Sequence, residues 1–184
     1  MQKVATDISQ LNFSRVAVIG CPGSGKTTFA KALSRILRRE VVHLDKVLWN
    51  PNWQMLEYDE RVKIHNQIIG GDSWIIDGMW KSHLPERIER ATLVIFLDYK
   101  RHVSLTRAIG RRLKFAGKQR DDIAEGCLEK LDGYFLKYIW TFRKNVRPLV
   151  LELLATHPQT QVVTLKTPKQ TTNFEMQLTR FFNS

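Results

Sequence analysis

The segment formed by residues 20–28 constrains this chain more than any other. It has the pattern G-x-x-x-x-G-K-T, it follows the apolar run 16–19, and it precedes a segment compatible with a helix. A strand, a glycine-rich turn and a helix N-terminus in this order direct backbone amides at one anion, which the helix dipole also favours. The pattern therefore predicts a loop that binds the phosphates of a nucleoside triphosphate. An ordinary glycine-rich turn is the alternative, and it leaves the lysine and the hydroxyl residue unexplained.

Two residues of this loop have chemically distinct roles. Lys26 is expected to reach the β- and γ-phosphates, and the hydroxyl of Thr27 is expected to bind Mg²⁺. ATP and Mg²⁺ are therefore the predicted cofactors. The residues expected to bind the nucleotide in this loop are Gly20, Pro22, Gly23, Ser24, Gly25, Lys26, Thr27 and Thr28.

Length and composition favour a small intracellular protein. The 184 residues predict one domain over 1–184, in which residues 1–13 form a loose lead-in. No apolar run approaches the ~20 residues of a membrane span, so no membrane partner is expected. Cys21 and Cys127 lack the spacing of a zinc or redox motif. A reducing, cytoplasmic location is the resulting expectation.

The net charge of +11 is the unusual feature of the composition. Such a charge indicates an anionic partner, which is a nucleotide, a polynucleotide or a membrane surface. Much of the charge lies in residues 107–120 and 143–147. We favour a phosphate-handling enzyme with cations near its site, because the chain has no recognisable nucleic-acid-binding motif.

Apolar runs alternate with helix-compatible segments along the chain. Strands are expected at 15–20, 41–44, 74–77, 93–98 and 161–165. Helices are expected at about 26–38, 58–69, 99–115, 124–155 and 169–182, the fourth being bent or broken at Pro148. Continuous apolar strands suit a sheet that is covered on both faces. The order predicts an α/β fold with a five-stranded parallel sheet and ligands at the carboxyl ends of the strands.

Three aspartates, Asp45, Asp77 and Asp98, each end one of these strands. A carboxylate there can order Mg²⁺-bound water, hold an acceptor hydroxyl or accept a proton. The alternative is a capping residue, which we favour for Asp98 because a helix follows it. Gly78 would allow a substrate to approach the backbone next to Asp77.

Tryptophans and arginines follow the strand ends. Trp49, Trp53 and Trp80 either line an acceptor site by stacking or belong to the core. The arginines of the basic helix, Arg107, Arg111 and Arg112, either neutralise the transferring phosphoryl group and contact adenine or form a solvated face. Arg120 lies in the polar segment 117–122, which is a candidate lid over ATP.

The chain as a whole resembles a known group of proteins. The matching segments are 20–28, 43–45 with Trp49, 75–78, 90–98, 111–113 and 125–127. They resemble the small P-loop proteins known as DNA topology modulation proteins or adenylate-kinase-related kinases, from about residue 15 to residue 165. The resemblance implies a P-loop NTPase of the nucleotide-kinase type, a three-layer sandwich with a short helical lid at about 107–124.

A wider resemblance to nucleoside monophosphate kinases implies further roles. Asp77 and Gly78 are similar to the segment of those kinases that helps to hold Mg²⁺ and faces the acceptor. Residues 107–112 resemble the start of their lid, and Thr167 lies where they place a loop beside adenine. Residues 79–81 depart from the kinase pattern and lack its acceptor-phosphate arginine, for which Arg87 is the candidate substitute.

These observations together predict an ATP- and Mg²⁺-dependent phosphotransferase that acts on a small, nucleotide-like or other, acceptor. Lys26, Asp45, Arg107 and Arg111 are its expected catalytic residues. The acceptor is expected at Asp45, Trp49, Asp77, Gly78, Trp80 and Arg87, with Thr27 and Asp77 at the metal. Two alternatives are a polynucleotide 5′-hydroxyl kinase and a non-catalytic, ATP-responsive DNA-binding or topology-modulating regulator.

Overall fold

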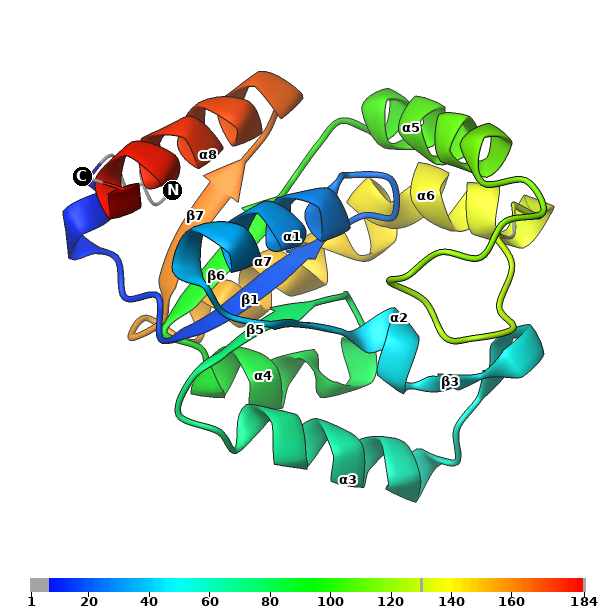
Figure 1. Cartoon of the computed structure of the whole chain (residues 1–184), viewed down its shortest axis with the longest axis horizontal. Helices are drawn as coiled ribbons and strands as arrows, with labels where there is room; N and C mark the ends of the chain where they lie inside the picture. Colours follow the sequence, from blue (N-terminus) through cyan, green and yellow to red (C-terminus); the bar gives the residue numbers. More distant parts are fainter. Residues whose placement is uncertain (1–6, 130, 184) are drawn as a thin grey trace.

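The computed structural model describes residues 7–129 and 131–183. Its centre is a five-stranded parallel sheet with the strand order β2-β5-β1-β6-β7, covered by helices on both faces (Figure 1). The predicted α/β fold with a five-stranded parallel sheet is therefore confirmed. The strands are β1 (Arg15–Gly20), β2 (Val41–His43), β5 (Trp74–Asp77), β6 (Leu93–Leu97) and β7 (Gln161–Leu165). A separate two-stranded hairpin consists of β3 (Trp49–Asn50) and β4 (Gln54–Met55).

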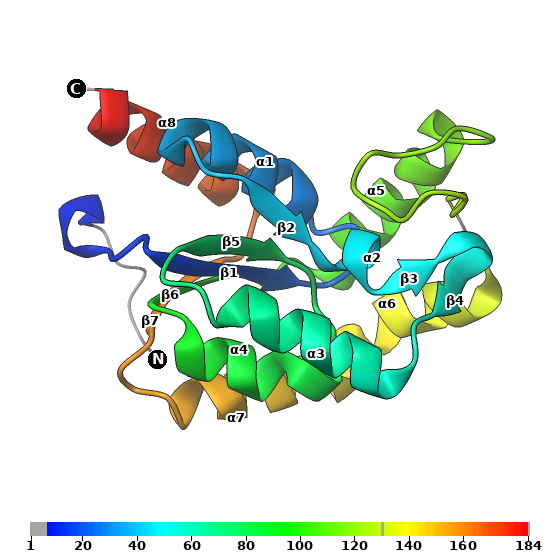
Figure 2. The ribbon, with the colours of Figure 1, turned by 60° about the horizontal axis from the view of Figure 1, so that its bottom comes forward.

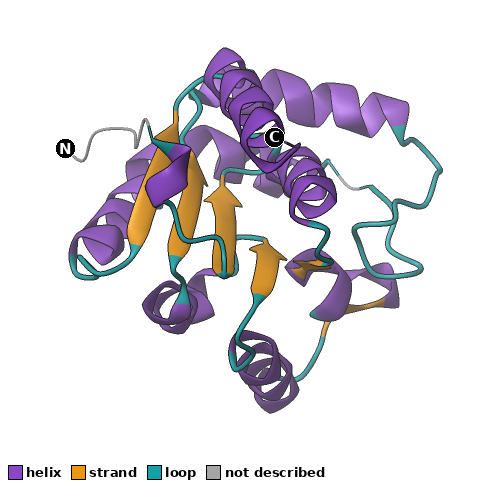
Figure 3. Cartoon of the chain, turned by 60° about the vertical axis from the view of Figure 1, so that its left-hand side comes forward, coloured by secondary structure: helices purple, strands orange, loops and turns teal. Residues whose placement is uncertain are grey.

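The three central strands, β1, β5 and β6, bury both of their faces, which is why they read as continuous apolar runs. Along β1, Val16 and Val18 contribute to one hydrophobic cluster, whereas Ala17 and Ile19 contribute to the other. Because side chains alternate across a strand, every second residue points to the same helical layer. The sheet twists as it passes between these layers (Figure 3).

The helices form the two outer layers. On one face lie α1 (Lys26–Leu37) and α8 (Pro168–Asn183), which pack against each other (Figure 2). The opposite face is covered by α3 (Tyr58–Ile69), α4 (Leu84–Arg90) and α7 (Arg147–Ala155) (Figure 2). At the carboxyl ends of the strands, α5 (Arg101–Lys114) packs against α6 (Gly133–Asn145). Short helices complete the list: α2 (Leu44–Val47) and the 3-10 turns η1 (Ile8–Gln10), η2 (Pro51–Trp53) and η3 (Lys81–His83).

The helix predicted at 124–155 is partly wrong. The chain has no helix between Lys114 and Gly133 in the described residues there, and α6 begins only after Asp132, whose carboxylate accepts a hydrogen bond from the Phe135 amide at 2.8 Å. Its break from α7 falls at Val146, two residues before Pro148, because proline fits only the first turn of a helix. We call the segment formed by residues 115–132 the strap.

Three smaller differences affect the site. The strand β2 ends at His43, and Asp45 lies in the helix α2. Residues 49–55 form the β3–β4 hairpin instead of a plain turn. The sequence analysis also missed η3 and α4, which follow β5. Among the helices described, none is long and apolar enough to cross a membrane.

Candidate active site

The turn between β1 and α1 depends on glycines. Gly20, Gly23 and Gly25 have φ angles of +150°, +80° and +91°, which L side chains rarely adopt. A Cβ at Gly23 would collide with the backbone carbonyl of Ser104 in α5. A Cβ at Gly25 would lie 2.7 Å from the Arg107 guanidinium of the same helix. Because these glycines have no Cβ atom, the Ser104 carbonyl and the Arg107 side chain of α5 can lie directly against the turn.

The first turn of α1 offers uncompensated positive charge. Its amides have no carbonyl partner within the helix, and Gly25 at the N-cap has no side chain to cap them. The Lys26 side chain is buried, and it has no hydrogen bond or ion pair with the residues that the structure describes. The hydroxyl of Ser24 is also buried without a partner. These groups fit a polyphosphate, which would satisfy all of them at once.

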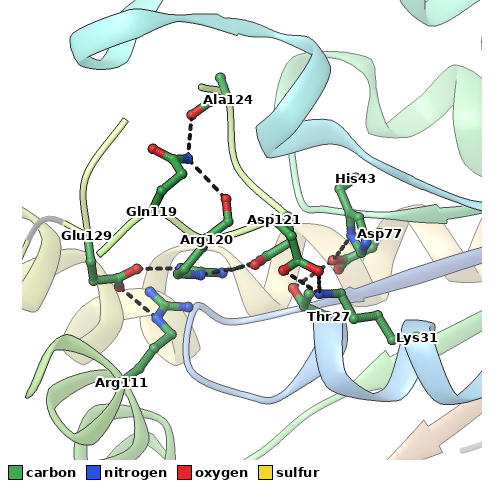
Figure 4. A network of polar contacts seen from close by, with 11 residues as sticks. Thr27, Lys31, His43, Asp77, Arg111, Gln119, Arg120, Asp121, Ala124 and Glu129 are labelled. Carbon is green, nitrogen blue, oxygen red and sulfur yellow. Dashed lines mark hydrogen bonds and ion pairs between the residues drawn. The ribbon is translucent and has the colours of Figure 1, made fainter. Parts of the chain in front are cut away.

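A hydrogen-bonded trio lies beside this turn (Figure 4). The Thr27 hydroxyl donates to Asp77 Oδ2 at 2.7 Å, and His43 Nδ1 lies 2.9 Å from the same oxygen. The register of β2 and β5 places His43 opposite Asp77. Burial alone would raise the pKa of Asp77, but the His43 and Thr27 hydrogen bonds and the charge of Lys26 outweigh burial and lower it. Asp77 is therefore a carboxylate, although it is almost fully buried.

The donor set fits Mg²⁺. The second oxygen of Asp77, Oδ1, is buried and has no hydrogen-bond partner. A hydroxyl and a carboxylate next to a phosphate-binding turn are the few protein oxygens that Mg²⁺ uses, since it keeps several waters and binds phosphate oxygens. No group of three or more His, Cys, Asp or Glu side chains capable of holding a metal occurs in the described residues. A metal here would thus be held together with the nucleotide.

Asp45 is the free carboxylate of the site. It is exposed in α2, and among the described residues nothing donates a hydrogen bond to its carboxylate or pairs with it. Crowding by the surrounding protein and the charges of Asp77 and Asp122 raise the pKa of Asp45, while Lys26 and Arg120 oppose that rise. Because the side chain is exposed, water screens these effects. Asp45 is available to accept a hydrogen bond or a proton.

The two predicted catalytic arginines of α5 have different surroundings. Arg107 is exposed, lies against Gly25 and forms no ion pair with a described residue. Arg111 donates to Glu129 Oε1 at 2.7 Å. Of the two, only Arg107 is free to contact a nucleotide without breaking an ion pair.

Arg120 is the centre of a buried ion-pair network (Figure 4). It donates to both oxygens of Asp122 and to Glu129, and Glu129 also accepts from Arg111. These hydrogen bonds and charges raise the pKa of Arg120 despite burial, which acts in the opposite direction. The network joins α5 to both halves of the strap. Arg120 therefore holds the strap together in this structure.

The strap also docks on the β3–β4 hairpin. Ile123, Ala124 and Cys127 are buried against Trp49 and Trp53. The Cys127 thiol donates to the carbonyl of Asn50, the Trp53 amide donates to the Cys127 sulfur, and the Trp53 indole donates to the carbonyl of Leu128 at 2.7 Å. At its other side, Asp121 accepts from Lys31 of α1 at 2.6 Å. The strap thus spans from α1 to the hairpin, past the turn that holds Lys26.

Three expected acceptor residues are engaged with the protein. Gly78, with a φ of +144°, leaves space that the Leu44 side chain fills, so the glycine serves the packing of α2 on β5. Arg87 is completely buried, and its Nη2 donates to the carbonyls of Gly78 and Met79 at 3.2 and 3.1 Å. Trp80 lies 4.2 Å from the His83 ring and packs on the core.

Two further residues lie at the edge of the site. Thr167 precedes α8, where its hydroxyl accepts from the Gln170 amide at 3.2 Å, and it is exposed. Asp98 is buried and accepts from Arg143 at 2.7 Å and from Arg147 at 2.8 Å. Asp98 therefore ties α6 and α7 to the end of β6.

The sequence analysis missed three residues that form hydrogen bonds or ion pairs with predicted site residues. His43 contacts Asp77, and Glu129 and Asp122 pair with the arginines. The sequence analysis assigns no role to His43, although it occupies the last position of β2. Only the strand order, which places β2 beside β5, brings it to Asp77. Glu129 lies in a segment predicted as a helix, whereas Asp122 lies in the polar segment 117–122, two residues from Arg120, where no pattern indicated an ion pair.

Comparison with known families agrees with this geometry. Residues 16–125, more than half of the chain, match a family described as an AAA domain. The chain belongs to this AAA domain family. The matched range of this AAA-domain protein includes the phosphate-binding turn, Asp45, Asp77 and the first part of the strap. A search of curated proteins found no match.

Solved structures show the same fold. A proposed kinase from Chloroflexus aurantiacus superposes with a TM-score of 0.52 at 16% identity, over 92% of this chain and 98% of the other. A shikimate kinase from Acinetobacter baumannii, in complex with shikimate, superposes with a TM-score of 0.53 at 14% identity, over 95% and 96% of the two chains. At such low identity these likenesses show the fold and not the substrate.

Proposed function

We propose that this AAA-domain protein is an ATP- and Mg²⁺-dependent kinase, which transfers the γ-phosphoryl group to a hydroxyl of a small acceptor. The acceptor binds at the carboxyl ends of β2 and β5, beside Asp45. The observation that carries the proposal is the trio Thr27–Asp77–His43 next to an unpaired, buried Lys26. Membership of a P-loop family and a fold shared with small kinases support it.

The residues divide the reaction between them. Lys26 and the amides of the turn hold the β- and γ-phosphates, and Arg107 contacts the nucleotide from above the turn. The acceptor oxygen forms a bond to the γ-phosphorus as the bond to the bridging oxygen of ADP breaks. The proton of the acceptor hydroxyl passes to the free carboxylate of Asp45. When bound, Mg²⁺ supplies positive charge that neutralises the phosphate oxygens.

Positioning accounts for most of the expected rate. Phosphoryl transfer needs little covalent help from a protein, so fixed charges and orientation dominate. His43 contributes by orienting Asp77, and Thr27 by holding the other side of the same oxygen. The strap lies where it would exclude water from the transferring group.

The test is ADP production from Mg·ATP in the presence of hydroxyl metabolites, nucleosides, nucleoside monophosphates and 5′-hydroxyl oligonucleotides. We expect acceptor-dependent ADP formation, which Lys26→Ala lowers by about a thousandfold or more because the mutation removes a charge that stabilises the transition state. Lys63→Ala, an exposed lysine of α3, is the matched control. Full turnover in Lys26→Ala would refute the site assignment.

The resemblance to DNA topology modulation proteins raises two alternatives that involve nucleic acid, and the same experiment distinguishes them. If oligonucleotides alone are phosphorylated, with affinity that falls steeply as salt increases, the protein is a polynucleotide 5′-hydroxyl kinase. ATP-modulated DNA binding without acceptor-dependent ADP formation would instead identify a regulator and refute the kinase proposal.

A further inference from the structure

We infer that the acceptor is an uncharged, hydroxylated ring, which is a free sugar or the sugar of a nucleoside, and not a phosphate or carboxylate ester of such a ring. This inference rests on the proposed function and concerns only the acceptor side of the site. It follows from the arrangement of charges there: the arginines of the acceptor side are paired with carboxylates, buried or stacked on aromatic rings, whereas a carboxylate and two tryptophans are available.

The two arginines nearest the strap carry no free charge. Arg111 and Arg120 share Glu129, and Arg120 is also paired with Asp122. Two guanidinium groups and two carboxylates make this network neutral. Glu129, Asp122 and Arg120 are all buried, so withdrawing an arginine for a ligand would leave a buried carboxylate unpaired.

The other arginines of this side are also engaged. Arg87 is buried below Gly78 and donates to backbone carbonyls. Burial lowers the pKa of Arg87 to about 10, so it stays charged at neutral pH, but it has no exposed surface that an acceptor could touch. Arg61 stacks on the rings of Tyr58 and Trp80, each 5.6 Å from its guanidinium carbon.

The negative charge of Asp45, in contrast, is offset only in part, by the charges of Lys26 and Arg120. The Asp45 carboxylate has no partner among the described residues, and Asp77 lies close enough to raise the pKa of Asp45. ATP adds further negative charge, which Lys26 and Mg²⁺ must offset. An anionic acceptor next to Asp45 would be repelled by this charge, and Arg107, which forms no ion pair with a described residue, lies against Gly25 on the nucleotide side. Neutral hydroxyls would instead donate hydrogen bonds to Asp45.

Aromatic surface is available beside Asp45. Trp49 follows the same helix, and its ring meets that of Trp53 edge to face, with 5.5 Å between the ring centroids. Both rings are half-buried, so part of each remains accessible while the strap covers the rest. The apolar face of a sugar or nucleoside ring can pack on an indole while its hydroxyls reach a carboxylate. The combination selects a neutral ring with hydroxyl groups.

Lys46 is the cation that tests this argument. It follows Asp45 in α2, is exposed, and forms no ion pair with a described residue. If Lys46 bound an anionic acceptor, the charge balance described above would be wrong. We expect it to be a solvated surface residue, so that Lys46→Gln leaves acceptor use unchanged.

The experiment compares matched pairs that differ only in charge: adenosine with AMP, glucose with glucose 6-phosphate, and methyl shikimate with shikimate. Affinity is measured by tryptophan fluorescence on the full chain with Mg²⁺ and a non-hydrolysable ATP analogue, and turnover is measured separately as ADP formation. We expect at least one neutral ring to bind more than about tenfold tighter than its charged partner, a difference of about 1.4 kcal/mol. Which pair responds distinguishes a free sugar from a nucleoside.

The outcomes separate the two claims. Tighter binding of a charged member, equal binding within every pair, or no binding of any neutral member overturns this inference. Turnover of a charged acceptor that Lys26→Ala abolishes would overturn it while leaving the kinase proposal standing. Binding of a neutral ring without any ADP formation would support the inference and contradict the kinase.

Two variants locate the effect. Asp45→Asn should weaken the neutral acceptor at least about tenfold and leave the ATP analogue bound, because it removes the charged hydrogen-bond acceptor. Asp59→Asn, an exposed aspartate in the first turn of α3, is the control. Glu129→Gln removes the carboxylate that pairs with Arg111, so that this arginine can attract an anion. The ratio of affinities between the neutral and the charged member of each pair should therefore decrease. An unchanged affinity in Asp45→Asn, or a loss caused by Lys46→Gln, contradicts the assignment.

Discussion

The two halves of the candidate site are built in opposite ways. The phosphate-binding half is one contiguous segment, residues 20–28, in which a lysine, a hydroxyl and the first amides of a helix lack partners. The strap and its neighbours form the other half, in which arginines and carboxylates of α5 and the strap neutralise one another. Buried polar groups without partners carry a free-energy cost that a ligand can relieve, whereas paired groups mainly hold structure.

The largest effect is expected from substituting a glycine of the phosphate-binding turn, compared with a glycine of the strap. Gly23→Ala would force a Cβ into the Ser104 carbonyl at a φ of +80°, so we expect about 4 kcal/mol of destabilisation and an affinity for ATP lowered at least about 100-fold. The free energy of unfolding in urea and a nucleotide-binding titration measure these effects.

Gly117→Ala in the strap is the matched control. Its φ is +68°, but no atom lies within 4 Å of the added carbon. We expect a loss of about 1 kcal/mol, which is the cost of the left-handed conformation alone. Equal effects of the two substitutions would show that the phosphate-binding turn and the strap do not differ as described.

The second effect concerns the ion-pair network of the strap. Glu129→Gln leaves Arg111 and one side of Arg120 without a carboxylate, so we expect about 3 kcal/mol of destabilisation, most of it as local opening of residues 115–132. Amide hydrogen exchange of this segment measures the opening. Glu125→Gln, an exposed residue of the same segment, should have no effect. Unchanged protection in Glu129→Gln would show that the network does not hold the strap.

The third effect is a pH dependence of folding stability, and it arises from His65, which packs against Trp80. His65 is fully buried against Trp80, and burial together with the charges of Arg87 and His83 lowers its pKa to about 4. Between pH 6.5 and 4 the unfolded chain binds a proton at this histidine and the folded chain does not. Its contribution to stability therefore falls as the pH falls through this range, by about 3 kcal/mol at pH 4.

Thermal unfolding as a function of pH tests this prediction. His65→Leu should flatten the decline of stability between pH 6.5 and 4, because it removes the group whose protonation differs between the two states. His102→Leu, which changes an exposed histidine of α5, should leave the decline as it is. If both variants keep the wild-type profile, His65 does not contribute to it.

The smallest expected effect is at the contact between the two halves. Lys31 of α1 pairs with Asp121 of the strap, whose side chain is 80% exposed. Exposed pairs contribute at most about 1 kcal/mol, so Asp121→Asn should shift the unfolding midpoint in urea only slightly. A double-mutant cycle with Lys31→Met measures the coupling. A coupling several times larger would show that the strap is held at α1 as firmly as at the hairpin.

The elements that sequence analysis predicted well are those with local causes. Helix α3 and the strand Trp74–Asp77 have their predicted bounds, because periodicity and flanking turn residues mark both ends. Residues 124–129 and 131–132 fall in a predicted helix and are not helical, since contacts of Ala124 and Cys127 with the hairpin outweigh the local preference of this part of the chain. Tertiary contacts of this kind leave no periodic pattern in the chain.

By itself the sequence determined the phosphate-binding turn and the individual strands of the sheet, because each has a local cause: glycines and a lysine in the turn, and unbroken apolar runs in the strands. Only the tertiary structure decided that His43 reaches Asp77, that Arg120 is neutralised by Asp122 and Glu129, and that Asp45 remains free. These relations depend on strand order and on the path of the strap. His43 and Asp77 are 34 positions apart, and Arg120 and Glu129 are 9 apart, so their spacing along the chain does not show that they meet in space.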